Sequence, residues 1–296
     1  MILADLPLPV WATLCPETPP KDIEVLGPDV WRVGDVVLKR FPEADLARFR
    51  RIVRAHRQAG RIFRGCEGMA AQRLRGFDEA SRALLLDFVP GRSGRMALLE
   101  DVAPEDLLAR AGAWLNHLHG ARAVSEGRFD PWGAIERLPQ TPNCAEPAGY
   151  EAAMARLRHE ADRLQGRQVR RACLHGDLTL ANLLFGQGVV TGIDFENLAQ
   201  HPADRDVGEI WADLLLHVRR LPSDLRLMPR AWEAAFARSY PDVRPKVARF
   251  YTRHRILKAW AAIPAEPPDR GPGRDRQLIN IRALMARGAF AETSQA

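Results

Sequence analysis

The chain has few cysteines and no long apolar segment. The four cysteines lie far apart and form no Cys-x-x-Cys pair: Cys15, Cys66, Cys144 and Cys173. This spacing argues against a zinc site or a disulfide framework and favours a reducing cytosol. No run approaches the roughly 18 apolar residues that a helix needs to span a bilayer. The first ten residues include Asp5 and lack a basic segment, so they do not read as a signal peptide. We therefore expect a soluble, cytoplasmic protein without a membrane span.

The sequence also lacks a strong excess of one charge. It has 43 Lys and Arg against 37 Asp and Glu, which gives a net charge of +6. This mild excess fits a protein that handles polyanions such as nucleotides. No basic stretch is interleaved with aromatic residues, so we expect no nucleic-acid partner. A chain of 296 residues can bury a large core, either as one domain or as two lobes.

Polar residues flank a short hairpin-like segment near the middle of the chain. A His-x-Asp-x-x-x-x-Asn pattern contains Asp177 and ends at Asn182, and Asp194 follows in Asp-Phe-Glu. Between them, two apolar runs enclose the turn Gly186-Gln187-Gly188, a pattern typical of a β-hairpin. Phosphoryl transfer needs one carboxylate to orient the attacking hydroxyl, and an amide oxygen and a second carboxylate to hold magnesium. The alternative is a buried polar hairpin without chemistry.

This set of residues, in this order and spacing, resembles the catalytic core of the aminoglycoside phosphotransferase and choline kinase group, relatives of the protein kinases. The resemblance implies ATP and Mg²⁺ as cofactors and a small molecule with a hydroxyl group as acceptor. It makes Asp177 the catalytic carboxylate, and Asn182 and Asp194 the magnesium ligands. It also implies an α+β, two-lobed, protein-kinase-like fold, with a small β-rich N-terminal lobe and a larger α-helical C-terminal lobe.

We divide the chain into three parts. Residues 1–20 are rich in proline and are expected to form an extended lead-in. Residues 21–90 would form the nucleotide-binding lobe, and residues 91–296 the catalytic and acceptor-binding lobe. In the smaller lobe we expect strands at 23–26, 30–33, 36–41, 69–77 and 82–89, and an amphipathic helix at 44–59.

Lys39 lies on the third of these strands. By the resemblance, it contacts the nucleotide phosphates; the alternative is a solvated lysine on a sheet face. Two features depart from the family. The turn Leu26-Gly27-Pro28-Asp29 is poor in glycine, so the cover over the phosphates would be short. The helix at 44–59 contains no glutamate to pair with Lys39, and its polar face carries arginines that are expected to be solvated.

The segment that ends in Val-Pro-Gly at residue 91 resembles the family's hinge between lobes. There the carbonyl of Asp87 and the amide of Val89 would bind the adenine edge, although the segment also reads as an ordinary core strand. Beyond it, residues 121–147 look irregular, and an aspartate at 206 or 204 is the family's expected brace for the catalytic loop. Helices are expected at 104–120, 148–165, 229–240, 242–260 and 275–288.

Three functional interpretations follow. The first is an ATP- and Mg²⁺-dependent phosphotransferase that moves the γ-phosphoryl group to a small-molecule hydroxyl. The basic charge balance tilts the acceptor towards a neutral or anionic molecule, such as a sugar or a phosphorylated metabolite. The second is a catalytically silent kinase-like binding protein, or a kinase for a protein or a lipid or sugar head group. Thr179 stands where serine/threonine protein kinases have lysine, which argues against a protein acceptor. The third, supported only by the high pI, is a nucleic-acid binder.

Overall fold

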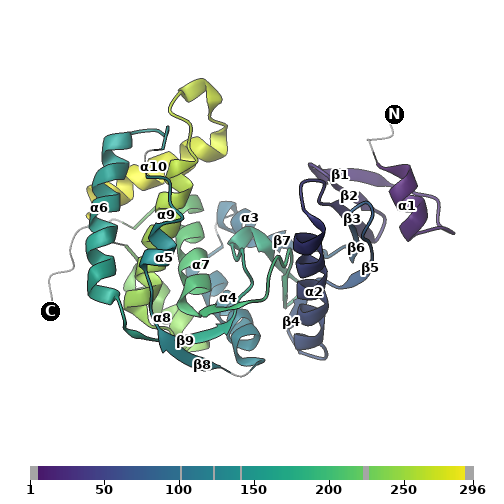
Figure 1. Cartoon of the computed structure of the whole chain (residues 1–296), viewed down its shortest axis with the longest axis horizontal. Helices are drawn as coiled ribbons and strands as arrows, with labels where there is room; N and C mark the ends of the chain where they lie inside the picture. Colours follow the sequence, from purple (N-terminus) through teal and green to yellow (C-terminus); the bar gives the residue numbers. More distant parts are fainter. Residues whose placement is uncertain (1–5, 101, 123, 141, 223–226, 291–296) are drawn as a thin grey trace. The chain divides into compact units, whose positions relative to one another are not determined.

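The computed structural model describes residues 6–100, 102–122, 124–140, 142–222 and 227–290. The chain divides into two compact units (Figure 1). The first unit comprises Met1–Arg92, His175–Asp177 and Asn182–Leu198. The second comprises Ser93–Leu174, Leu178–Ala181 and Ala199–Ala296. The hairpin that we assigned to the C-terminal lobe is thus grouped with the N-terminal residues, and the division at residue 90 stays a prediction.

A five-stranded antiparallel sheet forms the body of the first unit. Its strand order is β1-β2-β3-β6-β5, and every neighbouring pair is antiparallel. The strands expected at 23–26, 30–33, 36–41 and 82–89 are confirmed as β1 (Ile23–Gly27), β2 (Val30–Val33), β3 (Val36–Arg40) and β6 (Ala83–Asp87). The single strand expected at 69–77 is wrong, because this segment forms two strands: β4 (Met69–Ala71) belongs to a second sheet, and β5 (Leu74–Asp78) pairs with β6. Because successive side chains point to opposite faces, β3 contributes Val37 to one apolar cluster and Leu38 to the other.

Helices cover both faces of this sheet (Figure 1). The helix α2 (Leu46–Ile62) packs Phe49 and Ile52 against one face. Asp45 caps α2, since its side chain accepts a hydrogen bond from the Arg48 amide at 2.7 Å. The other face is covered by α1 (Leu8–Leu14) through the buried Trp11.

The extended lead-in expected for residues 1–20 is wrong, because α1 lies within it. Pro7 and Pro9 occupy the start of this helix. A backbone N–H in the first helical turn has no intrahelical acceptor, so proline loses nothing there and its fixed φ suits the helix. Burial of Trp11, which is 4% exposed, then holds the short helix on the sheet.

The central hairpin is confirmed. Strands β10 (Leu183–Gly186) and β11 (Val189–Gly192) pair antiparallel around Gln187 and Gly188, which have φ values of 41° and 81°. Two left-handed residues in succession are the geometry of a two-residue hairpin turn. On its other edge β11 pairs in parallel with β4 (Met69–Ala71). The sheet is completed by β7 (Arg92–Ser93) in the order β4-β11-β10-β7.

The second unit is mainly helical. The short sheet in it has the order β12-β9-β8, formed by β8 (Ser125–Arg128), β9 (Gln168–Cys173) and β12 (Gln200–Pro202). Its helices are α3 (Gly94–Leu99), α4 (Pro104–Gly120), α5 (Trp132–Ile135), α6 (Pro147–Leu164), α7 (Asp204–His217), α8 (Arg230–Ser239), α9 (Pro245–Ala261) and α10 (Pro272–Ala286). Within the ranges described, no helix has the length and apolar character to cross a membrane.

The five helices expected in this unit are confirmed as α4, α6, α8, α9 and α10. Residues 121–147 are not irregular throughout, because β8 and α5 lie within them. The sequence of β8, Ser-Glu-Gly-Arg, has no apolar alternation that would identify a strand. The segment is a strand because it pairs antiparallel with β9, and a sequence pattern does not reveal such a pairing.

Candidate active site

The residues expected to carry the chemistry all belong to the first unit. Lys39 lies on β3, and Asp194 follows β11. Asn182 ends a 3₁₀ turn at Leu180–Asn182, directly before the hairpin. Asp87 ends β6, and Val89 follows it by two residues.

Lys39 and Asp194 form an ion pair. The Lys39 Nζ lies 2.5 Å from Asp194 Oδ1, and the side chains are 22% and 35% exposed. The helix α2 contains no glutamate, so the acidic partner of Lys39 comes from the segment after the hairpin. Asp194 has a φ of 64°, in the left-handed region that few residues other than glycine adopt. Such conformations concentrate at functional sites, where the surrounding contacts maintain them.

Asn182 is oriented by a hydrogen bond to the backbone of the presumed catalytic residue. Its Nδ2 donates to the Asp177 carbonyl oxygen at 2.8 Å. A carbonyl can only accept, so the side-chain nitrogen must face it, and the Asn182 Oδ1 is left for another donor or a cation. No group of three or more His, Cys, Asp and Glu that could hold a metal occurs among the described residues. Magnesium needs no such cage, because it binds through one or two protein groups and the substrate phosphates.

His175 joins the segment of Asp177 to the segment of Asp194. Its ring is fully buried, and its Nε2 donates to the Ile193 carbonyl oxygen at 2.9 Å. The ring centroid also lies 4.6 Å from that of Phe195. These contacts of His175 hold the Asp177 segment against the Asp-Phe-Glu segment.

The glycine after His175 permits a close approach between the same segments. Gly176 has a φ of 98°, and a Cβ placed there would lie 3.1 Å from the Asn197 carbonyl oxygen. Any other residue at this position would be strained in its backbone and crowded by Asn197. The middle residue of the His-x-Asp pattern in this chain is therefore glycine for a steric reason.

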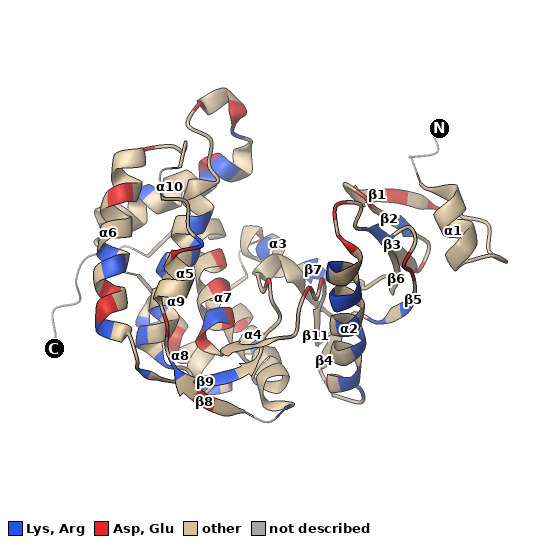
Figure 2. Cartoon of the chain, in the orientation of Figure 1, with Lys and Arg blue, Asp and Glu red and all other residues tan. Residues whose placement is uncertain are grey.

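The helix α2 contacts the Asp-Phe-Glu segment by two side chains that the sequence did not single out. The buried His56 packs edge-on against Phe195, with ring centroids 5.6 Å apart. Burial lowers the pKa of His56 to about 4, against the opposing effect of the Asp194 carboxylate, so its ring is neutral at pH 7. Arg48, one of the arginines that mark α2 in blue in Figure 2, lies 3.4 Å from Glu196 Oε1. Arg48 is therefore not simply solvated as expected.

In the segment expected to bind adenine, the Asp87 carbonyl already accepts one hydrogen bond, and the Val89 amide donates none to a described residue. The Asp87 carbonyl oxygen accepts from Gln72 Nε2 at 2.9 Å. A carbonyl has two lone pairs, so it can accept a second hydrogen bond. The amide of Val89 donates to no other residue in the described part of the chain. These positions keep the polar atoms that an adenine edge would need.

Two carboxylates on α7 hold the segment that directly follows Asp177. Glu209 Oε2 accepts from the Leu178 amide at 3.1 Å, and Asp213 Oδ2 accepts from the Leu180 amide at 2.9 Å. Residues four apart lie on one face of a helix, which brings both acids to the same loop. Asp206 and Asp204 were the acids expected to brace this loop, and the sequence pattern did not single out Glu209 and Asp213.

The two aspartates that were named make other contacts. Asp206 Oδ2 lies 3.1 Å from His119 Nε2. Asp204 Oδ1 accepts from the Arg244 amide at 2.7 Å. Burial raises the pKa of Asp204 to about 6, against the opposing effect of that hydrogen bond. A brace role for either aspartate stays a prediction.

Asp213 is the most strongly held carboxylate of this region. Its side chain is 3% exposed, and the Arg95 guanidinium contacts both of its oxygens, with Arg95 Nη2 2.5 Å from Oδ1. Burial acts to raise the pKa of Asp213, but hydrogen bonds from His217 and Arg95 outweigh it and bring the value to about 2. Asp213 is therefore ionised throughout the physiological range and can hold the Leu180 amide permanently.

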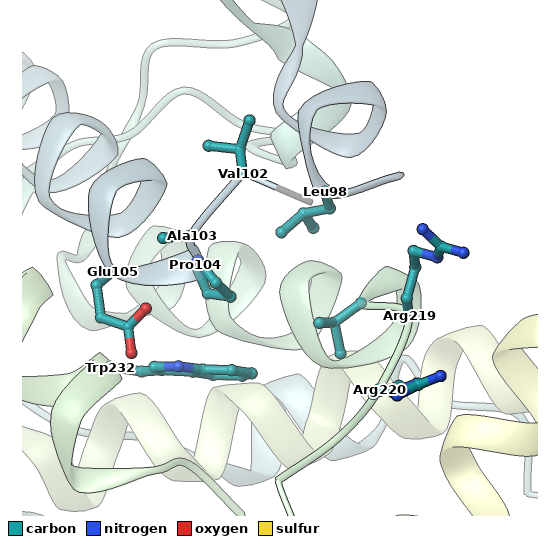
Figure 3. Close-up of a pocket in the computed structure, with 9 residues that line it drawn as sticks. Leu98, Val102, Ala103, Pro104, Glu105, Arg219, Arg220 and Trp232 are labelled. Carbon is teal, nitrogen blue, oxygen red and sulfur yellow. The ribbon is translucent and has the colours of Figure 1, made fainter. Parts of the chain in front are cut away.

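A cavity of about 570 Å³ lies in the second unit, beside the end of α7 (Figure 3). Leu98, Pro104 and Val218 form apolar walls around the buried Trp232. Figure 3 shows the Glu105 carboxylate over one end of the indole and Arg219 and Arg220 on the opposite side. The cavity thus combines one flat aromatic surface with charged groups of both signs.

Comparison with known proteins finds a matching phosphotransferase family and solved structures of kinases and phosphotransferases. Residues 26–215 match the phosphotransferase enzyme family. A search of curated proteins finds no match. Among solved structures, a choline/ethanolamine kinase family protein from Mesorhizobium loti is 18% identical, with a TM-score of 0.61 over 92% of this chain and 89% of that one.

Two further solved structures are similar over nearly the whole chain. The choline kinase LicA from Streptococcus pneumoniae is 13% identical, with a TM-score of 0.58 over 93% of this chain and 96% of that one. Aminoglycoside 2'-phosphotransferase-IIIa is 16% identical, with a TM-score of 0.59 over 95% and 97%. At these identities the structural likeness shows the fold, which is α+β and protein-kinase-like, as expected. The family match covers more than half of the sequence, and the chain therefore belongs to the phosphotransferase enzyme family.

Proposed function

We propose that this phosphotransferase moves the γ-phosphoryl group of ATP, with Mg²⁺, to a hydroxyl of a small molecule. The observation that carries the proposal is the Lys39–Asp194 ion pair, which lies in the same unit as Asp177 and Asn182. A cation for phosphates, two oxygen donors for a metal and one further carboxylate are the groups that phosphoryl transfer requires. The similar structures include both a GDP complex and an ATP complex, so the experiment below compares ATP with GTP as the phosphoryl donor.

Each residue has a distinct task in this proposal. Lys39 binds the phosphates, and the Asp194 carboxylate and the Asn182 Oδ1 hold the metal. Magnesium, when bound, neutralises the charge that develops on the phosphates. Asp177 accepts the hydrogen bond of the acceptor hydroxyl and orients it. The transition state is loose, so orientation and charge neutralisation dominate over proton abstraction.

The adenine is proposed to bind at the Asp87 carbonyl and the Val89 amide. The amide has no other acceptor among the described residues, and the carbonyl keeps a free lone pair. The cover over the phosphates is short, since β1 and β2 are joined by only Pro28 and Asp29. We therefore assign most of the phosphate binding to side chains and not to a glycine-rich loop.

The acceptor is proposed to bind in the cavity of Figure 3. This cavity begins at Val218, immediately after α7, and Asp213 of the same helix holds the catalytic loop at Leu180. A sugar-like acceptor has an apolar ring face for Trp232 and hydroxyls for Glu105 and the two arginines. This composition agrees with a neutral or anionic acceptor better than with a simple cation.

The decisive experiment measures Mg²⁺-dependent ADP release from ATP with an array of hydroxylated compounds. The array contains sugars, sugar phosphates, aminosugars, amino alcohols and nucleosides, and a parallel series uses GTP. We expect at least one compound to raise nucleoside diphosphate release above the rate in its absence. ATP binding without turnover across the array would instead favour the catalytically silent interpretation, and absence of ATP binding would contradict the proposal.

Lys39→Met is expected to lower kcat/KM for ATP by on the order of 100-fold, because one preorganised cation is removed from the phosphates. The matched control is Lys21→Met, which removes an equal charge from an exposed position without an ion pair in the described structure. Steady-state kinetics with varied ATP measure the effect. If both variants kept the unmodified kcat/KM, Lys39 would be only a solvated lysine.

A further inference from the structure

A second, smaller cavity in the second unit is lined mainly by cationic side chains. Its volume is about 230 Å³, and β8, β9, β12, α5, α9 and the start of α7 enclose it. We call it the basic pocket and define it by its charged residues: Arg128, Arg137, Arg171, Arg205, Lys258 and Asp130. It shares no residue with the candidate active site or with the cavity of Figure 3.

The ratio of cationic to acidic side chains is much higher in the basic pocket than in the whole chain. The whole sequence has 43 cationic against 37 acidic side chains, whereas five cations line this pocket with one carboxylate. Like charges repel one another most strongly where water screens them least; Arg171 and Arg205 are half-buried, whereas Arg128, Arg137 and Lys258 are exposed. Such a cluster is stabilised when an anion binds among its members.

The protein itself supplies little compensation for these charges. Arg205 Nε lies 3.3 Å from Glu209 Oε1, which also binds the Leu178 amide through its other oxygen. Arg137 and Lys258 form no ion pair with any carboxylate in the described ranges. Their positive charge is therefore available to a ligand.

Two further arginines are held in place without being neutralised. Arg128 Nη1 donates to the Gly166 carbonyl oxygen at 3.0 Å, and Arg171 Nη2 donates to the Gln200 carbonyl oxygen at 3.0 Å. A carbonyl fixes the guanidinium but carries no full charge. Each guanidinium has five N–H donors, so most of them remain free to contact an anion.

The remaining polar side chains of the pocket are His201, His254 and Tyr251, and none of them carries a negative charge. Burial, together with the neighbouring Arg205, Arg171 and Arg137, lowers the pKa of His201. Burial lowers the pKa of His254 to about 4, and its Nε2–H donates to the Ala134 carbonyl oxygen at 3.1 Å. Tyr251 is 6% exposed, and its hydroxyl has no hydrogen bond to another described residue. Among the described residues that line the basic pocket, Asp130 is the single carboxylate, so no second acid would repel an anion.

We propose that the basic pocket binds a small phosphorylated anion, of the size of pyrophosphate or a compact phosphomonoester. Guanidinium groups match the oxygens of phosphate in pairs and bind them with short, charge-assisted hydrogen bonds. The volume of about 230 Å³ lies below the roughly 300 Å³ at which pockets for drug-sized ligands begin, so it matches a pyrophosphate-sized anion better than a whole nucleotide. The proposal does not depend on the phosphotransfer reaction or on its acceptor.

The test measures pyrophosphate binding to the full chain by calorimetry, at low salt and with EDTA to remove divalent metals. We expect saturable binding of one pyrophosphate. The double variant Arg137→Gln/Lys258→Gln is expected to raise Kd by about tenfold or more, since two cations leave the pocket. Both residues are exposed and lack ion pairs in the described structure, so the fold is expected to persist.

Three controls separate this site from other sources of binding. Lys246→Gln/Arg276→Gln removes two exposed charges elsewhere in the same unit and is expected to leave Kd within twofold. Lys39→Met is expected to leave it unchanged as well, because Lys39 belongs to the nucleotide site. Equal weakening in both double variants, or loss of binding in Lys39→Met, would overturn the proposal. So would citrate binding as tightly as pyrophosphate, because the site would then not select phosphate.

Discussion

Asp177→Asn is expected to lower kcat for phosphoryl transfer by roughly 10²–10⁴-fold, while Kd for ATP changes by no more than about twofold. Asparagine keeps the size of the side chain but cannot accept a proton from the acceptor hydroxyl. The nucleotide contacts assigned to Lys39 and Asp194 do not involve Asp177, so nucleotide binding is expected to survive. Rapid-quench measurement of transfer and calorimetric titration of ATP separate the two quantities.

The matched control is Asp242→Asn, which changes an aspartate that is 57% exposed and pairs with Arg170 in the second unit. Its kcat is expected to stay within a factor of two of the unmodified protein. If Asp177→Asn kept more than a tenth of the kcat of the unmodified protein, Asp177 would not be the orienting carboxylate. Parallel loss of ATP binding would indicate that Asp177 supports the nucleotide site instead.

Asp213→Asn is expected to lower the free energy of unfolding by about 3 kcal/mol, the lower end of the range for breaking a buried ion pair. The lower end applies because the Arg95 side chain is 35% exposed, so water partly solvates the guanidinium that loses its partner. The Leu180 amide also loses a charged acceptor, and kcat is expected to fall with stability. Urea denaturation measures the stability, and Glu146→Gln, which breaks a pair with Arg282 whose side chains are 44% and 55% exposed, is expected to cost less than about 1 kcal/mol.

The pH dependence gives an independent check on Asp213. Its pKa of about 2 in the folded protein lies below the ordinary aspartate value of 3.8. A carboxyl whose pKa is depressed by folding stabilises the protein above its unfolded pKa, and this contribution disappears as the pH falls through the folded pKa. The stability difference between the unmodified protein and Asp213→Asn should therefore be constant from pH 7 to about pH 5 and shrink below pH 4. A difference that stayed constant down to pH 3 would mean that the charge of Asp213 contributes nothing.

The sequence predicted those parts of the fold that depend on local patterns. The hairpin β10–β11 follows from two apolar runs around Gln187-Gly188, and α2 and α4 follow from apolar stripes with clear ends. The short α1 was missed because prolines were read only as breakers, although proline is favoured in a first helical turn. The strand β8 was missed because its pairing with β9, and not its composition, makes it a strand.

The candidate site was predicted residue by residue but not as a set of contacts. Lys39, Asp177, Asn182 and Asp194 follow from their spacing, whereas the Lys39–Asp194 pair joins strands far apart in the sequence. Glu209 and Asp213 carried a usable signal, since two acids four residues apart on a buried helix must both find partners. Contacts such as Arg48–Glu196 depend on which residues the fold brings together, which composition alone does not specify.

The parallel pairing of β11 with β4 has a consequence for how the protein is made. Val190 lies opposite Met69, so β4 pairs with a strand, β11, that the ribosome synthesises much later. The intervening chain includes the four helices α3, α4, α5 and α6 and all of β9. Closing so long a loop is slow, because its entropy is lost before the contact forms. The nascent N-terminal segment therefore emerges with β4 lacking its β11 partner and with His56 lacking the ring of Phe195, and an unpaired strand edge of this kind favours misassembly until the hairpin has been synthesised.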